Sequence, residues 1–234
     1  MLRLPMQIQY IYEDEDMLVV NKPPSMPVHP DKTGSPSLYD YIKEPNRYLG
    51  LVHRIDRPTS GIVLFTWHKE ALVSLNDQLQ RRAVTRRYWA VTPSVPQVED
   101  DTLEHYIVVD HELNKSFAVP DERPGSRKAE MRYRLLAESE HYVLLEVELL
   151  TGRHHQIRAQ LAAVGTPVKG DIKYGAKRTN PGGGIHLHAR EVELVHPRTG
   201  APLSFTAPPP ADRLWDALRE SVESAESAGS AEQG

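Results

Sequence analysis

The sequence of 234 residues contains no cysteine, which excludes disulfide bonds and metal sites built on thiolates. It has no apolar run long enough to span a membrane. Its first twenty residues lack both the apolar stretch and the small-residue cleavage site of a signal peptide. Internal repeats and heptads are also missing. These absences favour a cytoplasmic protein that makes no membrane contact.

Neither sign of charge is in large excess: acidic residues outnumber basic ones only slightly, and the formal net charge is −4. From residue 216 onward the chain holds five acidic residues and one arginine, so this segment accounts for the whole excess. Its small, polar residues cannot bury apolar area, and we expect residues 216–234 to form an acidic, disordered tail. Residues 1–215 are formally neutral, and a neutral body can still carry a local basic face.

The hydrophobic pattern predicts short strands intermingled with a few helices. Strands are expected within residues 7–20 (two, with an acidic turn) and at 61–65, 88–91, 128–135, 143–149 and 191–195. Helices are expected at 37–43, 71–82 and 157–164, and Leu214, Trp215 and Leu218 form a last helical turn that docks. Residues 108–127 read as an irregular insertion. Without a regular βαβ rhythm, this order favours an α+β fold with a mixed, mostly antiparallel sheet flanked by helices and loops.

The first segment that can carry chemistry is HRIDRPTSG, in which Asp56 stands between Arg54 and Arg57. Guanidinium groups beside a carboxylate favour its ionised form. An ionised aspartate at the start of a buried strand can act as a nucleophile or a base. The alternative is an ordinary salt-bridged loop, which composition alone favours because such loops are common.

The second segment is RRAVTRRYWAV, where arginines bracket the end of a predicted helix and the start of a strand. The four are Arg81, Arg82, Arg86 and Arg87. Arginines interleaved with aromatic residues suit phosphate contact and base stacking. Strand alternation places Tyr88 and Trp89 on opposite faces, so we expect one of them to lie outside the core. A solvated helix end is the alternative.

The third segment is TGRHHQIR, which crowds polar residues at the start of a predicted helix: Arg153, His154, His155, Gln156 and Arg158. His154 and Arg158 are four residues apart and share a face. Adjacent histidines do not converge on one ion within a helix, so we predict no metal site. Phosphate contact is the better interpretation.

Together these motifs resemble the RNA pseudouridine synthases of the RluA type, over roughly residues 8–210. HRIDRPTSG is similar to the signature HRLDxxTSG of that family, and Tyr88 lies in its K-x-Y-x-A-x-V pattern. LLTGRHHQIRAQL and PVKGDIKYG resemble two further motifs, and Lys22-Pro23 resembles the first. The chain departs from the pattern at Ile55, at Arg86-Arg87, at His154 and at Gln160, and these departures leave the catalytic carboxylate in place.

The resemblance implies an enzyme that isomerises uridine to pseudouridine in structured rRNA or tRNA, without a cofactor, on a base flipped out of the RNA. It implies a catalytic domain over residues 1–215, standing alone without an S4 domain, and we expect a monomer. The implied catalytic residues are Asp56, Tyr88 and Arg158, with Arg158 paired to Asp56. Residues expected to bind RNA are Arg54, Arg57, Arg81, Arg82, Arg86, Arg87, Arg153, His154 and His155.

Two other functions remain possible from the sequence. One is a non-catalytic RNA-binding module of the same fold, which would need no carboxylate in the position of Asp56. The other is a nucleosidase acting on free nucleosides, which would be expected to show paired carboxylates.

Overall fold

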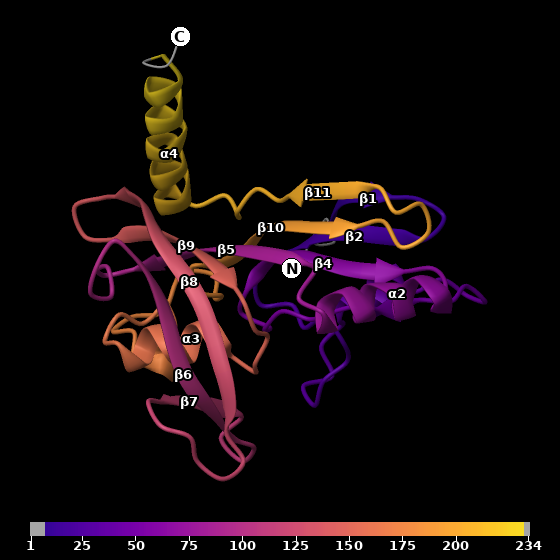
Figure 1. Cartoon of the computed structure of the whole chain (residues 1–234), viewed down its shortest axis with the longest axis horizontal. Helices are drawn as coiled ribbons and strands as arrows, with labels where there is room; N and C mark the ends of the chain where they lie inside the picture. Colours follow the sequence, from indigo (N-terminus) through magenta and orange to yellow (C-terminus); the bar gives the residue numbers. More distant parts are fainter. Residues whose placement is uncertain (1–7, 232–234) are drawn as a thin grey trace, which may run out of the picture. The chain divides into compact units, whose positions relative to one another are not determined.

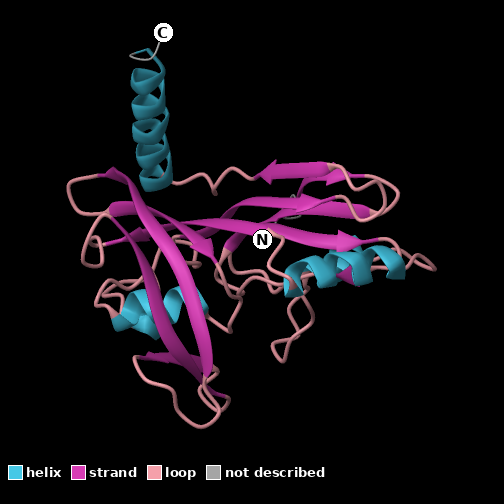
Figure 2. Cartoon of the chain, in the orientation of Figure 1, coloured by secondary structure: helices cyan, strands magenta, loops and turns pink. Residues whose placement is uncertain are grey.

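The computed structural model describes residues 8–231 (Figure 1). Strands dominate, and a few helices accompany them (Figure 2). Antiparallel pairing joins the strands for which the register is established, so the predicted α+β class with a mostly antiparallel sheet is confirmed. The chain divides into two compact units. The first unit comprises residues 1–86 and 189–208, and the second comprises residues 87–188 and 209–234.

In the first unit the strands follow the order β1-β2-β4-β10-β11, with the short β3 also paired to β4. Their bounds are β1 (Gln9–Glu13), β2 (Met17–Lys22), β3 (Gly50–Leu51), β4 (Ser60–Thr66), β10 (Leu187–Val195) and β11 (Pro202–Thr206). The helices are α1 (Leu38–Ile42), capped by Ser37, and α2 (Lys69–Gln80). The expected pair of strands within residues 7–20, the strand at 61–65 and both helices are confirmed.

The core of the first unit explains the unbroken apolar runs of β2 and β4. Every residue of β4 is buried, as are the first four of β2, because side chains from both faces of each strand are covered. Leu75 of α2 packs on Met17 and Leu64 in this core. Gly61 has a φ of 112°, and a β-carbon there would lie 2.3 Å from the carbonyl oxygen of Ala189, so only glycine allows β4 to approach β10.

In the second unit the strands follow the order β5-β9-β8-β6-β7. Their bounds are β5 (Thr85–Thr92), β6 (Asp100–Asp110), β7 (Lys115–Val119), β8 (Arg127–Glu138) and β9 (Val143–Leu149). The helical elements are α3 (Gln156–Ala163), η1 (Ile172–Tyr174) and α4 (Arg213–Ala231). The β8–β9 hairpin and α3 are confirmed, with Gly165 two residues after the end of α3, next to the C-cap Val164, at a φ of 83°.

The irregular insertion expected at residues 108–127 was wrong in part. β6 runs on to Asp110, and β7 pairs with it from Lys115 to Val119 across a turn that contains Asn114 with a φ of 47°. Only Ser116 of β7 is buried, so the strand lacks the alternation of buried apolar residues that marks a half-buried strand. It is held by its pairing with β6 and its packing against α3, which no local pattern encodes.

The tail expected to be disordered from residue 216 is helical as far as Ala231. The predicted docking of Leu214, Trp215 and Leu218 is confirmed, since these residues pack with Trp89 and Leu144. Val222 joins the same cluster and extends the apolar stripe beyond the docked turn. Residues 232–234 of the predicted tail lie outside the described residues. In the part of the chain described, no helix is long and apolar enough to cross a bilayer.

Helix α4 also corrects the expectation for β5. Tyr88 and Trp89 lie on opposite faces of this strand, yet both are buried, with exposed fractions of 7% and 6%. The face of Trp89 is covered by Trp215, Leu218 and Val222 of α4. The prediction that one aromatic lies outside the core assumed a sheet covered on one side only, and was therefore wrong.

Candidate active site

Asp56 lies half-buried in the loop between β3 and β4. The amide of Thr59 donates a hydrogen bond of 3.0 Å to the carbonyl oxygen of Asp56, which closes a turn just before β4 begins. Ile55 points inward and is 7% exposed, whereas Arg54 is exposed. The sequence therefore anchors the loop on either side of the carboxylate, through Ile55 and through the buried Thr59 and Ser60.

Lys22, at the end of β2, ties the Asp56 loop to the segment that follows β2. Its side chain is fully buried, and Nζ donates to the carbonyl oxygens of Pro23 (2.9 Å), Met26 (2.8 Å) and Arg57 (3.2 Å). Burial lowers the pKa of Lys22 to about 7, against the attraction of Asp56, which raises it. Sequence reasoning noted Lys22 only as part of a motif. Its position at the end of a strand that begins with four buried apolar residues was the available signal.

Arg57 binds the loop that follows β2. Its guanidinium donates to the carbonyl oxygen of Ser25 (3.2 Å) and to Thr33 Oγ1 (2.8 Å), and its Nη1 lies 3.3 Å from Asp31 Oδ2. Nη2 also donates to Ser35 Oγ at 3.2 Å. Arg57 thus makes the salt-bridged loop foreseen as the alternative for this segment. Its contact with RNA stays a prediction.

The four arginines around the end of α2 lie in different environments. Arg81 and Arg82 are exposed, and Arg81 forms an ion pair with Asp77 one turn earlier. Arg86 and Arg87 are half-buried, and Nε of Arg87 lies 3.7 Å from the carboxylate of Glu148. Arg81, Arg82 and Arg86 belong to the first unit and Arg87 to the second. Exposure leaves Arg81 and Arg82 able to meet a polyanion.

In the second unit, Arg158 on α3 forms a buried ion pair with Asp171. Nε and Nη2 donate to the two carboxylate oxygens at 2.6 and 2.9 Å, and the residues are 4% and 2% exposed. The guanidinium also lies 4.8 Å from the ring centre of Tyr174. Sequence reasoning quoted the motif PVKGDIKYG but gave Asp171 no role. The predicted pairing of Arg158 with Asp56 stays a prediction.

The TGRHHQ turn before α3 is tied together by Gln156. Its Oε1 accepts from Thr151 Oγ1 (2.8 Å) and from the amide of Arg153 (2.9 Å), while Nε2 donates to the carbonyl oxygen of Glu130 in β8 (3.0 Å). Nε of Arg153 donates to the carbonyl oxygen of Lys128 at 2.8 Å. These contacts fix the turn to β8, so Gln156 and Arg153 stabilise the conformation of the motif.

The two histidines of the motif stack on each other with ring centres 3.8 Å apart. Nδ1 of His154 lies 2.8 Å from Ser116 Oγ, and Nδ1 of His155 lies 2.9 Å from the hydroxyl of Tyr174. That hydroxyl also accepts a hydrogen bond of 2.8 Å from the amide of Ser116. The structure therefore brings His154, His155 and Arg158 into one network around Tyr174. The contact of His154 and His155 with RNA stays a prediction.

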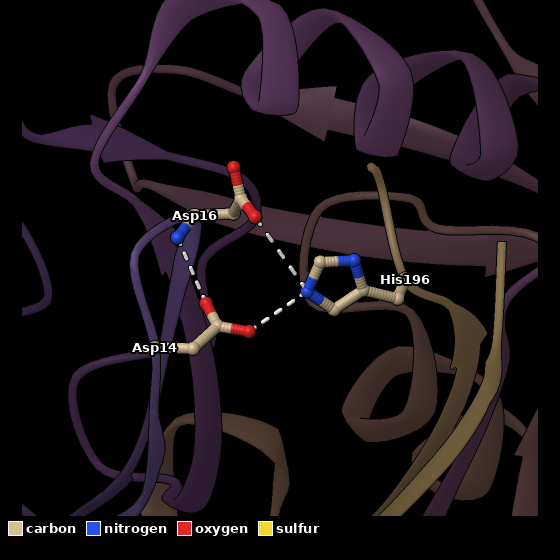
Figure 3. Close-up of side chains that lie close together, drawn as sticks. All are labelled: Asp14, Asp16 and His196. Atoms are coloured by element: carbon tan, nitrogen blue, oxygen red, sulfur yellow. Dashed lines mark hydrogen bonds and ion pairs between the residues drawn. The ribbon is translucent and has the colours of Figure 1, made fainter. Parts of the chain in front are cut away.

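A histidine and two acidic residues converge in the first unit, at a place that the sequence did not indicate. Figure 3 shows the imidazole of His196 pointing between Asp14 and Asp16. His196 Nε2 lies 2.7 Å from Asp14 Oδ2, and Arg198 Nε lies 2.7 Å from Asp16 Oδ2. A guanidinium already neutralises one of the carboxylates. Through these contacts the residues form an ion-pair cluster that joins the β1–β2 turn to the β10–β11 turn.

Comparison with known proteins agrees with the sequence motifs. Residues 16–163 match the family described as RNA pseudouridylate synthase. An uncharacterized RNA pseudouridine synthase of Bacillus subtilis, YlyB, is 37% identical over 89% of this chain and 71% of the relative. The ribosomal large subunit pseudouridine synthase D of Xanthomonas campestris is 34% identical over 91% of this chain and 70% of the relative. Among solved structures, the human RNA pseudouridylate synthase domain containing 4 shares the fold, with a TM-score of 0.71 at 23% identity over 92% of this chain and 93% of that one.

Proposed function

Because this chain belongs to the RNA pseudouridylate synthase family and is an RNA-modifying isomerase, we propose that Asp56 is its catalytic carboxylate. The observation that carries the proposal is the placement of Asp56. It lies half-buried in a turn whose backbone is held by the fully buried Lys22. A carboxylate that only formed a surface salt bridge would not need a buried ammonium group beneath its loop.

The reaction breaks the bond between C1′ and N1 of uridine, turns the uracil and joins C1′ to C5. C5 loses its proton and N1 gains one, so the atoms balance. Bond order and oxidation state are unchanged overall, so the isomerisation itself needs no cofactor. Asp56 attacks C1′, adds to C6 of the uracil or removes the proton from C2′. Each route begins from the ionised carboxylate, and each needs the uridine out of the RNA stack.

Tyr88 and Arg158 are the other proposed catalytic residues. Tyr88 is rigidly held in β5, opposite Val147 of β9, which suits a ring that must stack on the uracil. Arg158 is fixed in one conformation by its two bonds to Asp171, and we propose that it holds Asp56 charged. The exposed Arg54 is the candidate to fill the space left in the RNA by the flipped base.

The substrate is proposed to be structured RNA, rRNA or tRNA, bound by a monomer in the cytoplasm. The name of the Xanthomonas relative supports rRNA. The family match over residues 16–163 includes parts of both units, which supports the proposal that they form one catalytic domain.

The test compares Asp56→Asn with Asp121→Asn, an exposed aspartate of the second unit, as the matched control. Total RNA from cells without this gene is incubated with each purified protein, treated with CMC and reverse-transcribed. The CMC adduct of pseudouridine stops the reverse transcriptase, so each stop marks a pseudouridine. We expect wild type and Asp121→Asn to restore stops at one or a few uridines, and Asp56→Asn to restore none. Stops restored by a folded Asp56→Asn variant would refute the role of Asp56. Tight RNA binding without any stop from wild type would favour the non-catalytic RNA-binding module.

A further inference from the structure

A pocket of about 750 Å³ opens in the second unit, a size suited to a small organic ligand. Its lining comes from Pro93 after β5, from the β8–β9 turn and from residues 165–179. The lining includes none of the residues proposed above for catalysis or RNA binding, within the described part of the chain. Three cations face it, Lys169, Lys177 and Arg178, and the described lining contains no acidic residue. Such a pocket favours an anionic occupant.

Lys169 is set in place by a chain of buried polar groups. Its Nζ donates to Asn180 Oδ1 at 2.8 Å, and Asn180 Nδ2 lies 2.8 Å from Nδ1 of His186. Because that amide nitrogen can only donate, Nδ1 of His186 accepts, and Nε2 carries the hydrogen directed at Asp212 Oδ1, 3.1 Å away. Asn180 and His186 are 9% and 3% exposed. The ammonium group is therefore held by a rigid support.

An aromatic ring completes the pocket. Tyr142 lines it and is half-buried, and Nζ of Lys169 lies 5.6 Å from its ring centre. Lys177 and Arg178 are exposed beside the opening. Glycines at 165, 170 and 175 contribute backbone without side-chain bulk to the lining. Cations for phosphate together with an aromatic face for a base are the two elements that proteins use to hold single nucleotides of RNA.

We propose that this pocket holds one nucleotide of the substrate RNA, with its phosphate at Lys169, Lys177 and Arg178 and its base against Tyr142. The inference rests on the proposed function and deepens it. The bound nucleotide is not the reacting uridine, because the described lining offers no carboxylate for the chemistry. The pocket instead positions the RNA, as phosphate contacts do in general.

The first test measures salt-dependent binding of a fluorescein-labelled, unmodified tRNA transcript by anisotropy. The double variant Lys177→Ala/Arg178→Ala changes two exposed side chains, so it should fold. The matched control is Arg123→Ala/Arg127→Ala, two exposed arginines elsewhere in the second unit. We expect the pocket variant to bind about 10-fold more weakly at 0.1 M salt, with a slope of log K against log salt reduced by about 1–2. A slope and affinity equal to those of the control would overturn the inference.

The second test separates a nucleotide pocket from a diffuse basic patch. Tyr142→Ala should weaken binding about 5- to 100-fold while leaving the salt slope unchanged, because stacking is lost and charge is not. Tyr142→Phe keeps the ring and should bind as wild type does, which separates loss of the ring from loss of the hydroxyl. Circular dichroism establishes that the alanine variant is folded. Equal affinities for Tyr142→Phe and Tyr142→Ala in folded protein would contradict the proposal.

Competition by uridine 5′-monophosphate identifies the source of the nucleotide. We expect millimolar concentrations to compete weakly with the RNA. Tight binding of the free nucleotide, lost in Lys177→Ala/Arg178→Ala while RNA affinity stays intact, would make the pocket a mononucleotide site and overturn the inference. All three experiments measure binding, so they can fail while wild type still restores CMC stops. The proposed function itself fails only if wild type restores no CMC stops.

Discussion

The loop that carries Asp56 and the helix start that carries Arg158 are fixed by different chemistry. Beneath Asp56, the single ammonium group of Lys22 binds three backbone carbonyl oxygens, so what it holds is the path of the main chain. Around Arg158, the bonds run between side chains, and the key contact is a buried ion pair with Asp171. A backbone anchor tolerates changes in neighbouring side chains, whereas a buried ion pair fails when either partner is changed.

The largest effect is expected from Asp171→Asn, which keeps the shape of the side chain and removes its charge. Arg158 would lose the buried carboxylate that accepts two of its hydrogen bonds, and we expect the free energy of unfolding to fall by about 3–5 kcal/mol. Urea denaturation measures the loss. The double variant Arg158→Met/Asp171→Leu should regain much of this stability and no turnover. A double variant as unstable as Asp171→Asn would show that the charges do not dominate this region.

Lys22→Met tests the backbone anchor beneath the Asp56 loop. The carbonyl oxygens of Pro23, Met26 and Arg57 would lose their donor, and we expect a loss of about 1–3 kcal/mol, with turnover reduced more than RNA binding. Lys22 has a pKa of about 7 in the folded chain against 10.5 in an ordinary lysine. Between these values the unfolded chain binds more protons, so wild-type stability should rise with pH relative to Lys22→Met. A pH-independent difference would contradict the lowered pKa.

Whether the sequence could predict these two arrangements depends on how far apart the contacting residues lie along the chain. The motifs that contain Asp56 and Arg158 are local, and so are the apolar runs that predict β4 and α3. The partners are not local, because Asp171 is thirteen residues beyond Arg158 and the carbonyl of Arg57 is thirty-five beyond Lys22. The coverage of Trp89 by α4 joins residues more than a hundred positions apart. Such contacts depend on the whole topology, which residue periodicity does not contain.

A smaller effect is expected from the ion-pair cluster of Asp14 and His196, which lies away from both proposed catalytic segments in the chain. Burial acts to raise the pKa of Asp14, but hydrogen bonds from Tyr12, from the amide of Met17 and from His196 outweigh it and lower the pKa to about 2. A lowered carboxylate pKa contributes stability above pH 4 that is lost as the pH falls toward 2. We expect wild type to exceed Asp14→Asn by on the order of 1 kcal/mol at pH 5, in view of partial solvent screening. Urea titrations of both proteins at pH 5 and pH 3 should show the gap closing. A gap as wide at pH 3 as at pH 5 would contradict the assignment.

Arg81→Ala should have the smallest effect on stability and still change function. The side chain is exposed, and its ion pair with Asp77 within one helix contributes about 0.3–0.5 kcal/mol. If Arg81 meets a phosphate of the RNA, its loss should lower the slope of log K against log salt by about 1. Lys69→Ala removes an exposed cation from the opposite end of α2 and is the matched control. Anisotropy titrations at four salt concentrations distinguish the two, and equal slopes would place the RNA away from the end of α2. A changed slope with unchanged stability would distinguish Arg81 from both proposed catalytic segments. In those segments the buried contacts fix the position of a side chain, whereas Arg81 would act only by contacting the RNA.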